Sequence, residues 1–445
     1  MYDPLIDASP NRLSLPNSYW ASQISLGKLS PSLLGNHSAD VAIIGGGYTG
    51  LLTAYYLATE HQIDCHVLEA NQVGFGASAR NAGFVLKGSG RLGYAQMAKK
   101  WDLDTAKGIY HEFSDAVARV DDLIVSNQID CDKQEYGYLK VAHNAKAMQH
   151  LQNAADFIKN NFGGSDNSVE FINRDKFCKQ YMDHHQAYGA LRLSDGFGVQ
   201  PLKLLLGYKD LVTKSSVTVS EQSCVQEWVE ESGKHRLITD NGELTAQKVI
   251  CAGNAYTPKY FNQRIDNKYL PILSNIIVTE PLSEQQRLEA GIHTHQVTMD
   301  TRILKYYYRL LPDNRLLFGG RGAVWGKGAN NPIYSQRLKQ ALDRCFPSLA
   351  KVKVEYNWTG WIAAAFDDMP HVYEKKGVGY SLGYCGAGLS FSAQAAYQLA
   401  QSIAGETVPE LPLYKSPLPP MPFSKMKRWG QWAYYHYGYL KDRFS

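Results

Sequence analysis

The chain has 445 residues, which is too long for one hydrophobic core and predicts two domains. The formal net charge of +4 and the 20% of charged residues give no reason to expect a nucleic-acid partner. No apolar run reaches the ~18–20 residues that span a bilayer, and the first 20 residues lack the basic start and apolar core of a secretory signal, so we expect a cytoplasmic protein.

Seven cysteines are scattered along the chain without any CxxC pair. An odd number at irregular spacing argues against both a disulfide framework and a zinc site, and we expect reduced thiols. His293 and His295 have no third ligand in view, so we interpret them as loop residues. The sequence predicts no metal site.

The first 36 residues, rich in Pro, Ser and Asn, read as an irregular arm. An apolar strand follows at Val41–Ile44 and runs into glycines. Residues 51–58 are helical in character, and residues 65–68 form a second apolar strand. Strand, helix and strand fit within about 30 residues, which is the size of a βαβ unit.

The turn between this first strand and helix carries G-x-G-x-x-G at Gly45, Gly47 and Gly50, with Tyr48 and Thr49 inside it. The glycines permit a tight turn, close approach of a pyrophosphate and close packing of helix on strand. The helix N-terminus then favours the negative charge of the phosphates.

The second strand ends in Glu69-Ala70, and Glu69 lies nineteen residues after Gly50. A carboxylate there accepts hydrogen bonds from ribose hydroxyls and repels a 2′-phosphate, which disfavours NADP. Together these features predict a bound dinucleotide but do not separate NAD from FAD.

Further along, the pattern predicts helices at residues 95–127, 144–160 and 202–213, and an apolar strand at 248–251 that ends in Ala252-Gly253. Gly386-Ala387-Gly388 opens another helix. Dinucleotide-type features therefore recur in three separated segments. We expect an α/β cofactor domain of residues 37–95, 198–262 and 371–415, a substrate domain of 96–197 and 263–370, and an aromatic, basic tail at 416–445.

Directly after the second strand comes a loop of small and hydrogen-bonding residues: Gly76, Ala77, Ser78, Arg80, Asn81, Ala82 and Gly83. Small residues let backbone lie against a flat ligand. Here the sequence resembles the D-amino-acid-oxidase and glycine-oxidase-like FAD-dependent oxidoreductases. In that family this loop follows the diphosphate and ribityl chain toward the flavin. The resemblance implies FAD and a glutathione-reductase-like FAD domain, with a Rossmann-type parallel sheet, interleaved with an α+β substrate domain on a mixed sheet.

Other segments carry the same resemblance. Ala252 and Gly253 match the family's glycine turn, and Val225 sits where members contact adenine through backbone. The resemblance also implies a helix start over the flavin pyrimidine, at Gly386, Ala387, Gly388, Leu389 and Ser390. The γ-glutamylputrescine oxidase branch is a closer match, through residues 18–21, GGGYTG, the loop at 74–83, residues 316–321 and the terminal Asp442-Arg443.

Two departures qualify the resemblance. Amino-acid oxidases of the family place an arginine just after the glycine that Gly360 matches, whereas residues 361–365 read WIAAA. A free α-amino acid is then disfavoured unless another residue supplies the cation. The same stretch lacks the cysteine that binds flavin covalently in sarcosine oxidases, so we expect noncovalent FAD and interpret Cys385 as a buried spectator. No lysine occurs at residues 316–318, which leaves O2 or another electron acceptor open.

The resemblance implies oxidative deamination of a small amine, with hydride passing from the carbon that bears the neutral amine to flavin N5 and with hydrolysis of the imine. Tyr306 and Tyr308, which share one face of a strand, and Trp361 are candidate pocket walls, although core packing explains the tyrosines equally well. Arg309 and Arg321 are candidates to bind a distant anionic group such as a γ-glutamyl carboxylate, or else are surface residues. No base is assigned.

Two alternatives stay open. One is a dehydrogenase that passes electrons to a carrier or quinone; the tail at 425–443 is compatible with a membrane surface, although a terminal helix docked on the protein is favoured. The other is an FAD-bound assembly or maturation partner without a substrate of its own.

Overall fold

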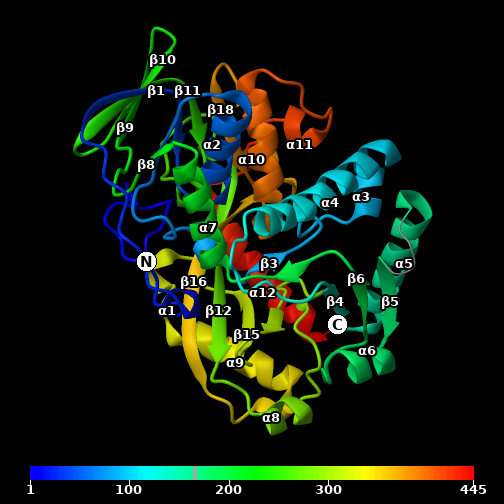
Figure 1. Ribbon diagram of the computed structural model, residues 1–445. Coiled ribbons are helices and arrows are strands. Elements are labelled where there is room, and N and C mark those ends of the chain that lie inside the picture. Colours follow the sequence, from blue (N-terminus) through cyan, green and yellow to red (C-terminus); the bar gives the residue numbers. More distant parts are fainter. Residues whose placement is uncertain (164–167, 445) are drawn as a thin grey trace.

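Two eight-stranded sheets form the framework of the molecule, seen in a computed structural model that describes residues 1–163 and 168–444. In Figure 1 the two sheets lie at opposite ends of the molecule. The strands of the first sheet come from residues 35–68, 218–251 and 371–382, and those of the second from 138–193 and 269–365. The chain therefore passes repeatedly between the sheets, while the predicted domain boundaries stay a prediction.

The first sheet has a parallel centre whose strands are apolar and buried at their carboxyl ends, which is typical of sheets covered on both faces. Its order is β17 (His371–Lys375), β18 (Val378–Leu382), β11 (Gly242–Cys251), β1 (Gly35–Ile44), β2 (Cys65–Leu68) and β8 (Thr218–Ser220), and β10 (Lys234–Ile238) and β9 (Glu227–Glu231) extend it from β11. The parallel strands bring the turns after β1, β2 and β11 to one edge of the sheet.

The second sheet is mixed, because β13 and β4 pair in parallel while the other neighbours are antiparallel. Its order is β16 (Val354–Ala365), β12 (Tyr269–Thr279), β15 (Leu316–Arg321), β14 (Tyr307–Leu310), β13 (Val297–Asp300), β4 (Tyr138–Ala142), β6 (Gly189–Leu193) and β5 (Val169–Asn173). A short pair, β3 (Phe84–Val85) with β7 (Phe197–Gly198), lies apart from both sheets. The α/β class and the mixed second sheet are confirmed.

The helices cover the sheets and link them. They are α1 (Tyr19–Ser22), α2 (Tyr48–His61), α3 (Tyr94–Lys100), α4 (Leu103–Ser126), α5 (Ala145–Phe162), α6 (Arg174–Gln180), α7 (Pro201–Lys214), α8 (Glu284–Glu289), α9 (Pro332–Cys345), α10 (Gly388–Ala404), α11 (Pro412–Lys415) and α12 (Lys427–Phe444). Helices α2 and α10 are buried over most of their surface, because they pack against each other as well as against neighbouring elements. Among the described helices, none combines the length and apolarity needed to cross a membrane.

Local structure departs from the sequence pattern in two places. The helix expected over residues 95–127 is divided into α3 and α4 at Trp101-Asp102, because the Asp102 carboxylate accepts a hydrogen bond from Thr105 N at 2.6 Å and begins a new helix. The arm expected to reach residue 36 ends earlier, since β1 already begins at Gly35 and pairs with β11.

Candidate active site

A cavity of about 960 Å³ lies between the two sheets. Its first end lies at the carboxyl ends of the parallel strands and is lined by the turns after β1, β2 and β11. Its second end lies against the second sheet and is lined by Lys140 of β4, Tyr307 of β14 and Arg321 of β15. Open α/β sheets bind ligands at such carboxyl ends, so the first end is the expected place for a dinucleotide.

The glycine turn at the first end allows no side chains at its contact points. Gly45 has φ +112°, and a Cβ there would lie 2.9 Å from the Ala252 carbonyl carbon. A Cβ on Gly50 would lie 2.0 Å from the Gly45 carbonyl oxygen. The turn after β1 and the loop after β11 are thus in backbone contact. Gly50 packs against Gly45 and Ala252 and does not line the cavity.

Helix α2 begins at this turn, and its N-cap residue, Gly47, has no side chain to cap it. Its first N–H, that of Tyr48, donates to Ser78 Oγ at 3.0 Å. The unpaired N–H groups and the helix dipole favour an anion at this point of the cavity.

Glu69 lies beside the glycine turn. Its Oε2 accepts from Gly46 N at 2.8 Å and its Oε1 from Asn71 N at 3.0 Å. Burial raises the pKa of this carboxyl, while the two N–H groups oppose the shift. Each carboxylate oxygen can accept a second hydrogen bond, so the held carboxylate suits two ribose hydroxyls.

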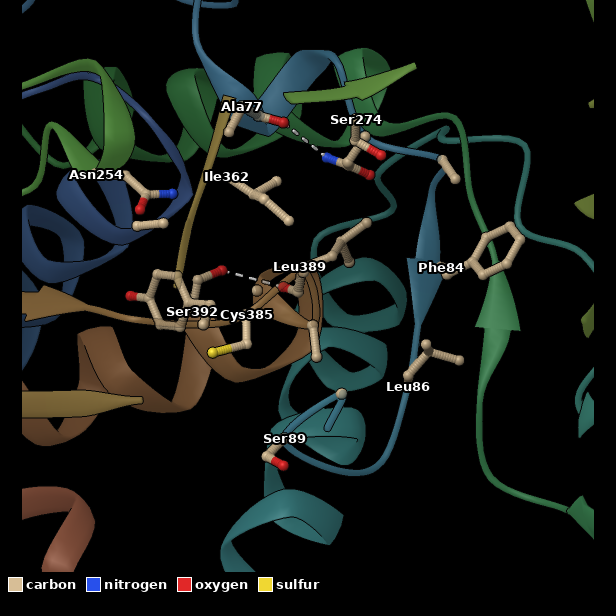
Figure 2. Close-up of a pocket in the computed structure, with 18 of the residues that line it drawn as sticks. Ala77, Phe84, Leu86, Ser89, Asn254, Ser274, Ile362, Cys385, Leu389 and Ser392 are labelled. Atoms are coloured by element: carbon tan, nitrogen blue, oxygen red, sulfur yellow. Dashed lines mark hydrogen bonds between the residues drawn. The ribbon is translucent and has the colours of Figure 1, made fainter. Parts of the chain in front are cut away.

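The loop at 76–83 is shaped by its own side chains. Asn81 Nδ2 donates to Ala77 O at 3.1 Å and to Ser78 O at 2.8 Å (Figure 2 shows the contact at Ala77). Arg80 Nε donates to Phe75 O at 2.6 Å and its Nη1 to Thr359 O at 3.2 Å. The expectation that Arg80 and Asn81 offer their donors to the ligand is corrected in part, because these donors hold the loop in place.

Helix α10 begins at the far side of the cavity. Its N-cap, Ala387, has no polar side chain, so the N–H groups of the first turn stay available. Gly386, Ala387, Gly388 and Leu389 line the cavity, and Gly386 has φ +96°. Ser390 does not line it: its hydroxyl donates to Leu86 O at 2.5 Å. Ser392, two residues further along, lines the cavity where Ser390 was expected (Figure 2).

The chemistry of this end fits FAD. Two helix N-termini, those of α2 and α10, reach one cavity and can meet the diphosphate and the negative charge of a reduced flavin ring. Asn254 contributes a buried Oδ1 that has no hydrogen-bond donor within the described chain, and it lies on the cavity wall. Ala70, Val225 and Gly253 also line this end.

Tyr306 and Tyr308 are placed in the core and not on the cavity, which corrects the expectation for both. The Tyr308 ring stacks on Phe318 at 5.5 Å, and the Tyr306 ring lies 5.3 Å from the same phenylalanine. Alternation along β14 turns Tyr307 to the opposite face, where it lines the cavity and its hydroxyl pairs with Ser274 Oγ at 2.7 Å. Three consecutive tyrosines gave no signal for choosing between the faces.

Arg309 is also placed away from the cavity. Its side chain is buried, with Nη2 donating to Val199 O at 2.6 Å and Nε to Ala82 O at 3.2 Å. It therefore fixes the loop that contains Ala82 and Gly83. Burial lowers the pKa of its guanidinium to about 9.

Trp361 borders the cavity, but its indole is fully buried and donates to Tyr2 O at 2.7 Å, beneath the Arg428 guanidinium at 4.7 Å. The next residue, Ile362, projects into the cavity instead (Figure 2). The predicted role of Trp361 as a pocket wall therefore passes largely to Ile362.

The second end of the cavity is basic. Its lining cations are Lys87, Arg91, Lys140, Lys305 and Arg321, while Glu69 at the other end is the one acid among the described lining residues. Lys87 pairs with Asp195 at 3.0 Å and Arg91 with Asp368 at 3.3 Å. Within the described chain, neither Lys140 nor Arg321 has a carboxylate within ion-pair distance. The predicted Arg321 is thus joined by three lysines and Arg91, which sequence reasoning missed.

Lys305 responds to these neighbours. Burial, together with the positive charges of Lys140, Arg91 and Arg321, lowers the pKa of its ammonium to about 7. Its Nζ donates to Gly90 O. Burial also lowers the pKa of Lys140. A lone lysine inside the apolar strand YLKVA was the available sequence signal for Lys140.

Cys385 lines the cavity as a thiol. Burial raises its pKa to about 12, and Sγ donates to Gly383 O at 3.1 Å. A protonated, hydrogen-bonded sulfur is chemically quiet, which agrees with the expected spectator role.

Comparison with known proteins agrees with this geometry. Residues 40–402 match the family model described as DAO, FAD dependent oxidoreductase. The chain is 32% identical over 395 residues to the gamma-glutamylputrescine oxidoreductase of Escherichia coli K12, covering 88% of this chain and 89% of that protein. The L-amino acid deaminase of Proteus vulgaris superposes with a TM-score of 0.71 at 16% identity, covering 90% and 100% of the two chains.

Glycine oxidase from Geobacillus kaustophilus superposes with a TM-score of 0.68 at 17% identity, covering 85% of this chain and 98% of that one. These structural likenesses support the fold, and the family match covers most of the chain. The chain belongs to the DAO family of FAD-dependent oxidoreductases.

Proposed function

We propose that the protein oxidises a small amine that carries an anionic group away from the reacting carbon, a γ-glutamylputrescine-like substrate. The observation that carries this proposal is the basic end of the cavity. Lys140 and Arg321 line it there without an acidic partner in the described chain. Two partly buried cations without an acidic partner are stabilised by an anion, so a substrate carboxylate is the natural partner.

The origin of these cations also bears on the missing arginine after Gly360. A carboxylate held by that arginine would sit next to the reacting carbon. Here the cations come from β4, β15 and the loop before β14, so the anionic group is recognised by other parts of the second sheet and not by β16, which carries Gly360. This supports an amine with a distant carboxylate over a free α-amino acid.

When bound, FAD supplies the two-electron acceptor for oxidation of the substrate C–N bond. The protein's part is to bind the amine in its neutral form. An amine with pKa near that of lysine, ~10.4, needs about 4–5 kcal/mol to lose its proton at pH 7. Apolar lining groups such as Phe84, Ile276 and Ile362 disfavour the ammonium and reduce that cost.

Lys305 suits both demands of this substrate. With a pKa of about 7, its ammonium adds a third charge for the anion at neutral pH, while its neutral form can accept a proton inside the cavity. The Tyr307 hydroxyl, bound to Ser274, adds a fixed polar group on the same wall.

The test is anaerobic mixing of the FAD-loaded protein with a panel of amines, read as bleaching of the flavin absorbance. The panel contains γ-glutamylputrescine, its carboxylate-free counterpart N-acetylputrescine, putrescine and free α-amino acids. We expect fastest bleaching with the amine that carries the carboxylate. Bleaching by none of them would contradict an amine-oxidising function and favour the assembly-partner alternative.

Two further parts of the proposal are noncovalent FAD and electron transfer to O2. Acid precipitation is expected to leave all flavin in the supernatant, since residues 361–365 contain no cysteine. Peroxide formed in air with one equivalent of product indicates an oxidase. Turnover with a dye or quinone but without peroxide would show a dehydrogenase.

A further inference from the structure

Helix α12 packs on the protein with a mostly polar face, which also carries the buried ring of Tyr435. Arg428 Nη2 donates to Asp3 Oδ1 at 2.9 Å and its Nη1 to Pro271 O at 2.8 Å. At the other end of the helix, the Asp442 carboxylate accepts from Ile303 N and Leu304 N, both at 3.0 Å. Both ends of α12 are therefore held by buried ionic and hydrogen-bonded contacts.

The outward face of the same region is aromatic and apolar. Phe423 is 84% exposed, Trp429 is 62% exposed and Leu440 is 60% exposed, and Met426, Trp432 and Tyr437 are exposed beside them. We call these six residues the aromatic face. An ordinary surface helix has the reverse arrangement, with apolar residues inward and polar residues outward. An apolar patch of this kind on a surface marks a place where another apolar phase is contacted.

The aromatic face continues onto a neighbouring segment. The Trp325 ring lies 6.0 Å from that of Trp429, edge to face, and Trp429 lies 6.4 Å from Trp432 in the same manner. Trp325 is itself partly exposed. The indoles therefore form a connected surface group.

The charge around the aromatic face is positive. Besides the inward Arg428, which pairs with Asp3, residues 421–445 contain Lys425, Lys427, Lys441 and Arg443 but only one acid, Asp442, whose carboxylate points inward to the 303–304 backbone. Tryptophan and tyrosine flanked by lysine and arginine are the residues that lie at the headgroup level of bilayers.

We propose that the aromatic face docks α12 flat on a membrane surface that contains anionic lipids. The helix is about 27 Å long at ~1.5 Å per residue, enough for its indoles and tyrosines to enter the headgroup layer together. A second copy of the chain is a poorer partner. Two-fold pairing would bring the same basic rim against itself.

Docking through this face would bring the membrane close to the cavity, because α12 contacts a loop that lines it. A Cβ on Gly438 would lie 2.9 Å from Leu304 Cγ, so α12 closely contacts the loop whose next residue, Lys305, lines the basic end. The membrane surface would then lie one helix away from the substrate end.

The experiment is co-sedimentation of the full chain, loaded with FAD, with vesicles. Vesicles of phosphatidylcholine with about one third phosphatidylglycerol are compared with pure phosphatidylcholine, because each basic residue near an anionic surface adds to the attraction. We expect at least tenfold tighter binding to the anionic vesicles, weakened as salt is raised. Equal absence of binding to both would overturn the proposal.

Variants locate the contact. The double variant Trp429→Ser/Trp432→Ser is expected to weaken vesicle binding at least tenfold, and Lys425→Gln/Lys441→Gln to remove the preference for anionic lipid. The matched control is Tyr188→Ser, an exposed tyrosine on the loop before β6. Flavin content and thermal unfolding report whether each variant is folded.

Light scattering without lipid gives the remaining outcome. A concentration-dependent dimer that becomes a monomer in Trp429→Ser/Trp432→Ser would assign the aromatic face to a protein interface and overturn membrane docking. A monomer in both proteins is the expected result.

Discussion

The two ends of the cavity are built by different means. The FAD end uses backbone: glycine turns after β1 and β11, and the N-termini of α2 and α10. The other end uses side chains, with cations from β4, β15 and the loop before β14 on a mixed sheet. Backbone recognition needs short runs of glycine at fixed spacing, whereas side-chain recognition needs only that separate strands meet. Backbone recognition can therefore be predicted from a sequence, whereas side-chain recognition cannot.

The strongest way to break this comparison is to put a side chain into the glycine turn. In Gly50→Val, Cβ would clash with Gly45 O at 2.0 Å, so the turn cannot close. We expect FAD content below about a hundredth of wild type, with a loss of stability of roughly 3 kcal/mol or more.

The readouts for Gly50→Val are flavin absorbance per protein and the thermal unfolding midpoint. Gly27→Ala is the control, because a Cβ there meets nothing within 4 Å. Normal flavin content in Gly50→Val would show that backbone contact does not build this end.

The basic end is tested by Lys140→Met and Arg321→Met. Each removes one cation while keeping much of the side-chain length. A hydrogen bond to a charged group contributes about 1.5–3 kcal/mol, so kcat/KM for the anionic amine should fall about 10–100-fold in each variant.

For the carboxylate-free amine, the same variants should stay within about threefold of wild type, and the control Lys351→Ala, which is exposed, should change neither substrate. An equal loss for both substrates would mean that these residues support the fold and not the anion.

The pH dependence follows from Lys305. Its ammonium has a pKa of about 7 in the free protein, and a bound anion raises that pKa, so anion binding takes up a proton. Affinity for a carboxylate inhibitor without an amine is then highest below pH 7 and falls as pH rises through and above it.

Calorimetry of a dicarboxylate inhibitor between about pH 6 and pH 9 measures this, with proton uptake read from buffers of different ionisation enthalpy. Lys305→Arg should keep its affinity over that range, since arginine stays charged. A wild-type affinity that does not change with pH would exclude Lys305 from the anion site.

At limiting substrate the protonation of the free amine dominates the pH dependence of turnover. We expect kcat/KM to rise with pH toward the amine pKa, because only the neutral form is oxidised, with the rise blunted above pH 7 as Lys305 loses its charge. A profile that is flat from neutral to alkaline pH would contradict binding of the neutral amine.

The smallest effect separates the two faces of β14. Tyr307→Phe breaks the contact with Ser274 on the cavity wall and should lower kcat/KM by about 3–10-fold, the usual worth of one hydrogen bond. Tyr308→Phe removes a buried hydroxyl that has no partner in the described chain, so stability should be unchanged or rise by up to about 1 kcal/mol. Reversed outcomes would put the substrate on the other face.

Only part of the candidate site could be predicted from the sequence. The GGGYTG turn, the acid after β2 and the small-residue loop predicted the first end, since local spacing fixes all three. Ser390 was misplaced by two positions because a helix start gives no signal for which hydroxyl turns inward. Tyr306 and Tyr308 were expected where Tyr307 lies, because a one-residue choice of strand face depends on the neighbouring sheet.

Lys140 and Lys305 lie 165 residues apart and become neighbours only through the parallel pairing of β4 with β13. No local sequence pattern predicts that these two lysines are close in space. Arg309, in contrast, points into the protein, where backbone carbonyls accept its hydrogen bonds.

The central claim is that a neutral amine is oxidised faster when a distant anion occupies the basic end. The most direct measurement is the anaerobic rate of flavin bleaching by γ-glutamylputrescine and by N-acetylputrescine at limiting concentration. We predict at least a tenfold advantage for the first, abolished in Lys140→Met/Arg321→Met. Equal rates in the wild-type protein, or an advantage that survives in the double variant, would contradict it.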